Sequence, residues 1–151
     1  MIKINYNGYI KGVDRRVVAS AVEFFASKLL TRCKLENTSI LVRFIKMEEA
    51  WGFCQIHEDE DNVYSPKSFK IDVSSEVPLL HLLETIAHEM VHLKQFRNME
   101  LKYREKFTMF QGVTYSLDTP YSDEPWEQEA YSMEEVLVNM FIDYYLENNK
   151  E

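Results

Sequence analysis

The order of the elements expected from the sequence indicates an α+β fold, with about three helices packed on one face of a small, mostly antiparallel sheet. The order is strand, helix, three strands, helix, a short hairpin and a final helix. Strand segments are recognised by alternating polarity, and helices by apolar residues that recur every three or four positions. Repeats and Pro- or Gly-rich linkers are missing from the 151 residues, so a single domain over 1–151 is expected.

The first half of the chain supplies one helix and four strands. Residues 2–10 alternate loosely and are expected to form a strand. Asp14 is a suitable N-cap for a helix over 15–32, because apolar residues follow at helical spacing. Residues 39–46 and 51–58 are also strand-like, and the short connection between them predicts an antiparallel hairpin.

The second half begins with a strand over 68–74, in which apolar and polar residues alternate as they do in a strand with one wet face. Ser74 or Ser75 is expected to cap a helix over about 76–97, with Pro78 tolerated in the first turn. Residues 107–117 predict a short hairpin that turns near Gln111 and Gly112. A long final helix is expected over about 124–147.

Composition excludes several classes of protein. The net charge of −8 and the pI near 5.1 argue against a nucleic-acid-binding protein. One basic cluster is interpreted as a solvated helix end followed by a loop: Lys94, Arg97, Lys102, Arg104 and Lys106. No apolar run approaches the length of a membrane span, and the first residues lack the apolar stretch of a signal peptide, so a cytoplasmic protein is expected. Cys33 and Cys54 lack CxxC spacing and are expected to be buried free thiols.

The segment TIAHEMVHLKQF (85–96) contains the pattern HExxH on a predicted amphipathic helix. At 100° per residue, His88 and His92 lie one turn apart, on the side opposite to the apolar stripe. Both imidazoles can therefore reach one metal ion, and zinc is well suited to histidine nitrogen. Glu89 cannot share that ion, but it is placed to act as the general base that activates a water. The pattern predicts a zinc site if this face of the helix lines a cleft.

A catalytic zinc generally takes three protein ligands. No histidine follows His92, so a downstream carboxylate is expected, and the segment PWEQEAYSMEEVL (125–137) supplies candidates. Glu127 and Glu129 are two residues apart, so a helix cannot direct both at one ion. Both flank the apolar stripe of the final helix at similar angles, and helical geometry alone does not choose between them.

These motifs resemble those of the gluzincin metallopeptidases, in which a second helix supplies a glutamate to the zinc bound by HExxH. The stretches HEMVHLKQ and PWEQEA are also similar to segments of small phage-encoded HExxH proteins, and the looser likeness covers about 80–137. The resemblance implies a minimal zincin-like fold and, through the pattern E-x-x-A, selects Glu127 as the third ligand. The likeness to phage-encoded proteins implies that the protein, if it is phage-encoded, works in the host cytoplasm. The chain departs from the pattern at Tyr131, where such families often carry Asp or Asn.

Other polar residues around the motif have weaker signals. His81 shares the face of the two motif histidines and is interpreted as a surface residue, and His57 needs no role. Gln95 lies one turn past His92 and could contact a ligand or simply be solvated. Three tyrosines could each stabilise an oxyanion: Tyr115, Tyr121 and Tyr131.

Three functions are compatible with these residues. The first is a zinc metallopeptidase with Zn²⁺ on His88, His92 and Glu127, Glu89 as base, and a peptide or protein substrate paired with strand 68–74 as a sheet edge. The second is a zinc-containing binding module that acts on a host protein without turnover; an intact Glu89 argues against it. The third, a DNA-linked protease, is disfavoured by the acidic charge and by the lack of a four-cysteine zinc ribbon. Nucleic acid and membrane are not expected partners, and the oligomeric state is left open.

Overall fold

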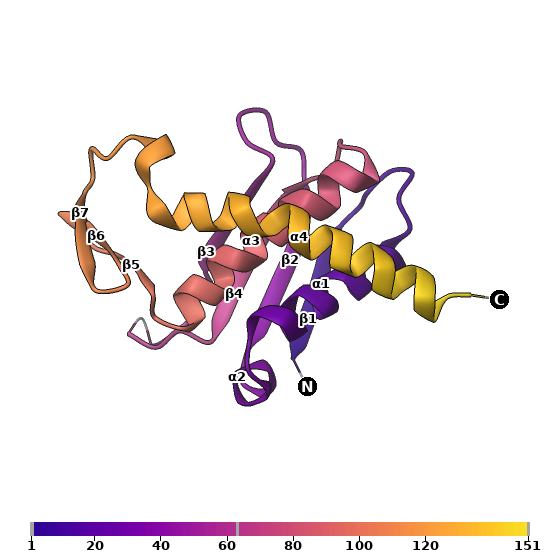
Figure 1. Cartoon of the computed structure of the whole chain (residues 1–151), viewed down its shortest axis with the longest axis horizontal. Coiled ribbons are helices and arrows are strands. Elements are labelled where there is room, and N and C mark those ends of the chain that lie inside the picture. Colours follow the sequence, from indigo (N-terminus) through magenta and orange to yellow (C-terminus); the bar gives the residue numbers. More distant parts are fainter. Residues whose placement is uncertain (1, 63, 151) are drawn as a thin grey trace.

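A computed structural model describes residues 2–62 and 64–150, and these form helices and two small sheets, which confirms the predicted α+β class (Figure 1). The elements follow in chain order: β1 (Lys3–Gly8), α1 (Arg15–Leu29), α2 (Arg32–Glu36), β2 (Ser39–Ile45), β3 (Gly52–Ile56), β4 (Ser68–Ser74), α3 (Leu79–Arg97), β5 (Leu101–Tyr103), β6 (Phe107–Phe110), β7 (Val113–Ser116), η1 (Tyr121–Asp123) and α4 (Pro125–Asn148).

The larger sheet has the strand order β1-β2-β4-β3. It is mixed rather than mostly antiparallel, because β1–β2 and β2–β4 are parallel and β3–β4 is antiparallel. The predicted hairpin of 39–46 with 51–58 is therefore wrong, since β4 lies between those two strands. In β4 the apolar side chains of Phe69, Ile71 and Val73 are buried in the core. Burial of this face gives β4 the central place, and β3 forms an outer strand of the described sheet.

The smaller sheet contains β5, β6 and β7 in antiparallel order. The predicted hairpin at 107–117 is confirmed. Its turn residues Gln111 and Gly112 both have positive φ, at 50° and 80°, as two-residue hairpin loops require. Strand β5 was not expected, and it adds to the hairpin by pairing Leu101 with Phe110. This sheet lies beyond the ends of α3 and α4 (Figure 1).

The helices lie close to their expected positions. Asp14 caps α1 through a hydrogen bond from the Arg16 backbone N–H, as predicted. Helix α1 ends at Leu29 rather than at 32, and the short helix α2 follows. Helix α3 begins at Leu79, three residues later than expected, because Ser74 still belongs to β4 and Pro78 is extended at the N-cap. Helix α4 matches the range predicted for the final helix.

Helix α3 is buried on two sides. Its apolar stripe enters the hydrophobic core, where Leu82, Ile86, Met90 and Leu93 are completely or almost completely inaccessible. Helix α4 crosses α3 on the other side (Figure 1). The crossing covers the polar face of α3, where His88 and His92 are each only 7% exposed. The histidine face is therefore largely buried rather than a fully solvated surface.

The face of the larger sheet opposite the core is held by ion pairs. Arg43 on β2 forms two hydrogen bonds with Asp72 on β4, at 2.7 and 2.8 Å. Lys70 on β4 forms an ion pair with Glu58 at 2.9 Å. These pairs neutralise the polar side chains that alternate with the apolar ones along β4.

Other sequence expectations have mixed outcomes. Cys54 is partly buried, but Cys33 is exposed, so the expected burial of both thiols is wrong for Cys33. Lys94 and Arg97 are engaged inside the fold, with Glu129 and Thr38 respectively, and do not belong to a solvated helix end. In residues 2–62 and 64–150, none of the helices has the length and apolar character needed to cross a membrane.

Candidate metal centre in a cleft between α3 and β3

A cleft of about 680 Å³ runs between α3 and the outer strand β3. Its lining includes residues of β3 and α3 and their neighbours, among them Trp51, Ile56, His81, Phe96 and Tyr103. The motif residues also line it, together with side chains from η1 and α4: His88, Glu89, His92, Tyr121, Glu127, Tyr131 and Glu134. The sequence predicted a zinc site on condition that the histidine face of the helix lines a cleft, and in the structure this face of α3 does line one.

Glu127 on α4 contacts both motif histidines. Its Oε1 lies 2.9 Å from His88 Nε2, and its Oε2 lies 2.9 Å from His92 Nε2. One ligand atom from each of these three residues falls within 4.8 Å of the other two, so the group could hold a metal ion. Burial opposes the charged carboxylate, but the hydrogen bonds with His88 and His92 outweigh it and hold the pKa of Glu127 far below its usual range.

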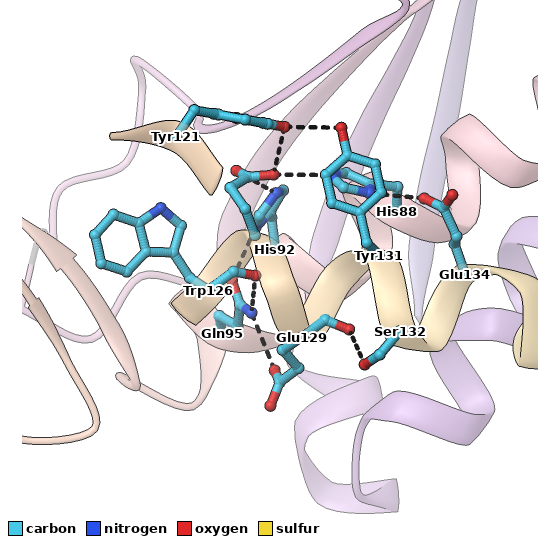
Figure 2. A network of polar contacts seen from close by, with 10 residues as sticks. His88, His92, Gln95, Tyr121, Trp126, Glu129, Tyr131, Ser132 and Glu134 are labelled. Carbon is cyan, nitrogen blue, oxygen red and sulfur yellow. Dashed lines mark hydrogen bonds and ion pairs between the residues drawn. The ribbon is translucent and has the colours of Figure 1, made fainter. Parts of the chain in front are cut away.

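The far nitrogen of each histidine also has a partner (Figure 2). His88 Nδ1 lies 2.8 Å from Oε2 of Glu134 on α4. His92 Nδ1 lies 2.8 Å from Oε1 of Gln95, which is completely buried one turn along α3. Such partners fix the orientation of a metal-binding imidazole and determine which nitrogen carries the proton.

This donor set fits a cation. A neutral imidazole has one N–H and can donate one hydrogen bond, but each ring here has an acceptor at both nitrogens. Burial lowers the pKa of His88 and His92, and the contacts with Glu127 more than compensate, so both pKa values are raised. Either both rings carry an extra proton or a cation replaces the two Nε2 protons. Two imidazole nitrogens and one carboxylate are the ligands of many catalytic zinc sites.

Glu89 lies beside this group on the wall of the cleft nearest to β3. It is 7% exposed, and burial raises its pKa to about 7 against the opposing effect of His92 and His88. The backbone of β3 comes very close to it at Gly52. A Cβ atom at Gly52 would lie 2.6 Å from Thr85 Cγ2 and 3.0 Å from Glu89 Cγ, so only glycine fits without displacing a neighbour.

Helical geometry alone did not choose between Glu127 and Glu129 as the third ligand, but their contacts in the structure differ. Glu127 reaches the histidines, whereas Glu129 faces away from them and accepts hydrogen bonds from Gln95 and Lys94. Glu134, the other carboxylate near the group, contacts His88 at Nδ1 and not at Nε2. The choice of Glu127 from the family resemblance therefore agrees with its place beside both histidines.

Two of the three candidate tyrosines line the cleft. Tyr121 donates a hydrogen bond to Glu127 Oε1 at 2.8 Å, and its oxygen is 3.1 Å from the Tyr131 hydroxyl. The Tyr131 ring packs edge-on against His88 (Figure 2). Tyr115 instead packs against Trp126 and is not among the residues that line the cleft.

The structure also shows where His81, Gln95 and His57 lie relative to the cleft. His81 lines the cleft, half-buried against the Trp51 ring, and is not the plain surface residue expected. Gln95 is not solvated but holds His92. His57 is not among the residues that line the cleft and lies beside the acidic residues at 58–61, where its Nδ1 accepts a hydrogen bond from the Asp59 backbone.

The expected sheet edge needs correction. Strand 68–74 is β4 and is paired on both sides, so it offers no edge to a peptide. The outer strand that borders the cleft is β3. On either side of it, the Trp51 carbonyl accepts a backbone hydrogen bond from Ser74 of β4, and the His57 N–H donates one to the Ser68 carbonyl of β4. In an antiparallel strand, every second residue directs its backbone N–H and C=O groups at the neighbouring strand, and the residues between them direct theirs away. The groups that point to the open side therefore belong to Gly52, Cys54 and Ile56. All three residues line the cleft.

One functional candidate was missed in the sequence, and the role of another was not foreseen. Glu134 belongs to the segment 125–137 that supplies candidate ligands, but its contact with His88 Nδ1 was not predicted. It lies seven residues, or two helical turns, after Glu127, so the helical period could have placed both on one face. No sequence pattern indicated a role for Gly52, because its importance comes from the close approach of β3 to α3 in the fold. In comparisons with protein-family models, with curated proteins and with solved structures, nothing matches this chain.

Proposed function

We propose that this protein is a zinc-dependent metallopeptidase, as the resemblance to gluzincin-type enzymes implies. The observation that carries the proposal is the contact of one carboxylate, Glu127, with the Nε2 atoms of both HExxH histidines, all three residues lining one cleft. His88, His92 and Glu127 would hold the ion. When bound there, zinc would polarise a peptide carbonyl and make a water more acidic.

The residues of the chain divide the remaining work. Glu89 is the base that takes a proton from the attacking water and can later deliver it to the departing amine nitrogen. A side chain with a pKa near 7 suits both halves of this exchange. Tyr121 and Tyr131 present hydroxyl groups to the same cleft, where Tyr121 donates to Glu127 and lies within hydrogen-bond distance of Tyr131. Either could donate to the oxyanion of the reacting carbonyl by exchanging its present hydrogen bond for one to the substrate.

The substrate would be a peptide or a protein segment in extended form. The free backbone groups of Gly52, Cys54 and Ile56 can pair with such a segment as an added strand. This pairing would bring the peptide along β3 and past Glu89, which contacts the same strand at Gly52.

Metal content and cleavage test this function together. The purified chain, supplied with zinc, is expected to retain about one ion per molecule by elemental analysis. It is then incubated with a diverse peptide library beside its Glu89→Gln variant. We expect that variant to keep its zinc and its fold while hydrolysis falls by about 10²–10⁴-fold, the usual contribution of a general base.

The outcomes separate the proposed functions. A chain that binds no zinc contradicts the metallopeptidase. A chain that binds zinc but cleaves no peptide in either form would instead support the zinc-containing binding module. Cleavage at the native rate by Glu89→Gln would remove Glu89 from the mechanism.

A further inference from the structure

Gln95 is held in one orientation by groups that lie away from the metal-binding residues. Its side chain is completely buried between α3 and α4. Its amide nitrogen donates to the Trp126 backbone carbonyl and to Glu129 Oε1, both at 3.0 Å. Both amide hydrogens are therefore used, and the amide oxygen is left to face His92 Nδ1 (Figure 2).

This orientation has a chemical consequence for His92. An amide oxygen accepts hydrogen bonds only, so His92 must carry a proton on Nδ1 to satisfy it. The Nε2 lone pair is then free to point at a metal ion. If the amide were reversed, its N–H groups would face Nδ1, and its oxygen would face a carbonyl and a carboxylate, all in a buried site.

Glu129 makes this orientation the stable one. Its Oε1 accepts from Gln95 and also forms an ion pair with Lys94 at 3.1 Å, which balances its charge. Lys94 is in turn fixed by Glu100 at 3.0 Å. Glu129 is thus a hydrogen-bond acceptor held in place, and it touches neither histidine of the motif.

We propose that Glu129 is a positioning residue that sets, through Gln95, the tautomer and orientation of His92 for metal binding. The proposal rests on the zinc site proposed above. The proposal gives Glu129 a role other than that of a metal ligand. It also gives Lys94 and Gln95, which follow His92 by two and three residues, a part in positioning His92. The dependence on Glu129 is through its acceptor oxygen and not through its charge.

Conservative and truncating variants distinguish these roles. Glu129→Ala removes the acceptor and should weaken zinc binding about 10-fold, the lower end of what outer-shell partners of a metal site contribute. Glu129→Gln keeps an acceptor oxygen for Gln95 and should bind zinc within about twofold of the unchanged chain, within the usual scatter of such contributions. Glu135→Ala is the matched control, because it removes a charge from an exposed position on the same helix. Zinc affinity is measured by competition with a chelator.

A second readout follows the hydrogen bond itself. In the zinc-loaded protein, exchange of the His92 Nδ1 proton with water is measured by NMR and should be slow in the unchanged chain. It should be faster in Glu129→Ala and slow again in Glu129→Gln. In a Gln95→Leu background, Glu129→Ala should cause no further loss of zinc affinity, because the intermediate group has gone. Circular dichroism confirms that each variant is folded.

The results distinguish failure of the positioning role of Glu129 from failure of the proposed function. An equal loss for Glu129→Gln and Glu129→Ala, additive losses with Gln95→Leu, or no loss for Glu129→Ala would each overturn the positioning role. If the unchanged chain binds no zinc, the proposed function fails instead.

Discussion

The backbone of Gly52 lies directly against the side chain of Glu89. A Cβ atom at Gly52 would be 3.0 Å from Glu89 Cγ and 3.2 Å from its Oε1. These residues come from β3 and α3, so the distance between the outer strand and the motif helix is set at this point. The approach also places the open edge of β3 beside the proposed base.

Gly52→Ala should therefore displace the proposed base, Glu89, without contacting a proposed metal ligand. We expect a loss of about 1–3 kcal/mol in the free energy of unfolding, as for other overpacked sites. Peptide hydrolysis should also fall, while zinc affinity changes little. Adding Thr85→Ser removes the nearest clashing atom, Cγ2, and should restore part of the stability. Unchanged denaturant unfolding and activity in Gly52→Ala would show that β3 and α3 are not this close.

Glu127→Ala should produce the largest loss of zinc affinity among the carboxylate variants. It leaves two imidazoles and an incomplete ligand set, so the loss should be at least about 100-fold, the upper end for outer-shell partners. Glu129→Ala should cost less, and Glu135→Ala should cost nothing. Chelator competition on the three proteins gives the order. A larger loss for Glu129→Ala than for Glu127→Ala would reverse the assignment of the third ligand.

The open edge of β3 can be tested at Cys54. Its backbone N–H points away from β4, so proline at this position removes no bond of the sheet and only the group offered to a substrate. Cys54→Pro should raise KM for peptide cleavage strongly with a smaller effect on kcat. Cys54→Ser keeps the N–H and serves as the control for loss of the thiol. Equal kinetics of the two variants would exclude strand pairing at this edge.

A fourth test concerns the strand order. Arg43 and Asp72 are paired in register on the parallel strands β2 and β4. A double-mutant cycle with Arg43→Met and Asp72→Asn should give a coupling of about 1 kcal/mol, less than for a buried pair because Arg43 is partly exposed. Urea unfolding supplies the four free energies. Coupling close to zero would bring the pairing of β2 with β4 into question.

Local signals in the sequence were sufficient for most of the elements. The cap at Asp14, the helical stripes and the turn at Gln111 and Gly112 depend on neighbouring residues, and each was found close to its expected place. Strand pairing is different, because it joins segments far apart in the chain. The short connection after β2 favoured a hairpin, but the apolar face of β4 competes for the central position and occupies it.

The same distinction applies to the site. His88, Glu89 and His92 could be placed on one helix from their spacing alone. The choice between Glu127 and Glu129 could not be made in this way, since it depends on how α4 crosses α3. Gln95 belongs to the recognised segment, but its role requires Glu129 on the other helix. In each case the sequence alone does not reveal the tertiary contacts between α3 and α4 on which the assignment depends.

The separation of the proposed metal ligands along the chain has a consequence for synthesis in the cell. Glu127 follows His88 by 39 residues, and the whole of the smaller sheet lies between them. A growing polypeptide that has not yet reached α4 therefore contains the two histidines and the proposed base without the carboxylate that contacts the histidines. The ribosome must deliver the N-terminal part of α4, and that helix must dock on α3, before the proposed catalyst is complete. Hydrolytic activity would thus be withheld from the partly made chain, which is the form most vulnerable to cutting itself or its neighbours.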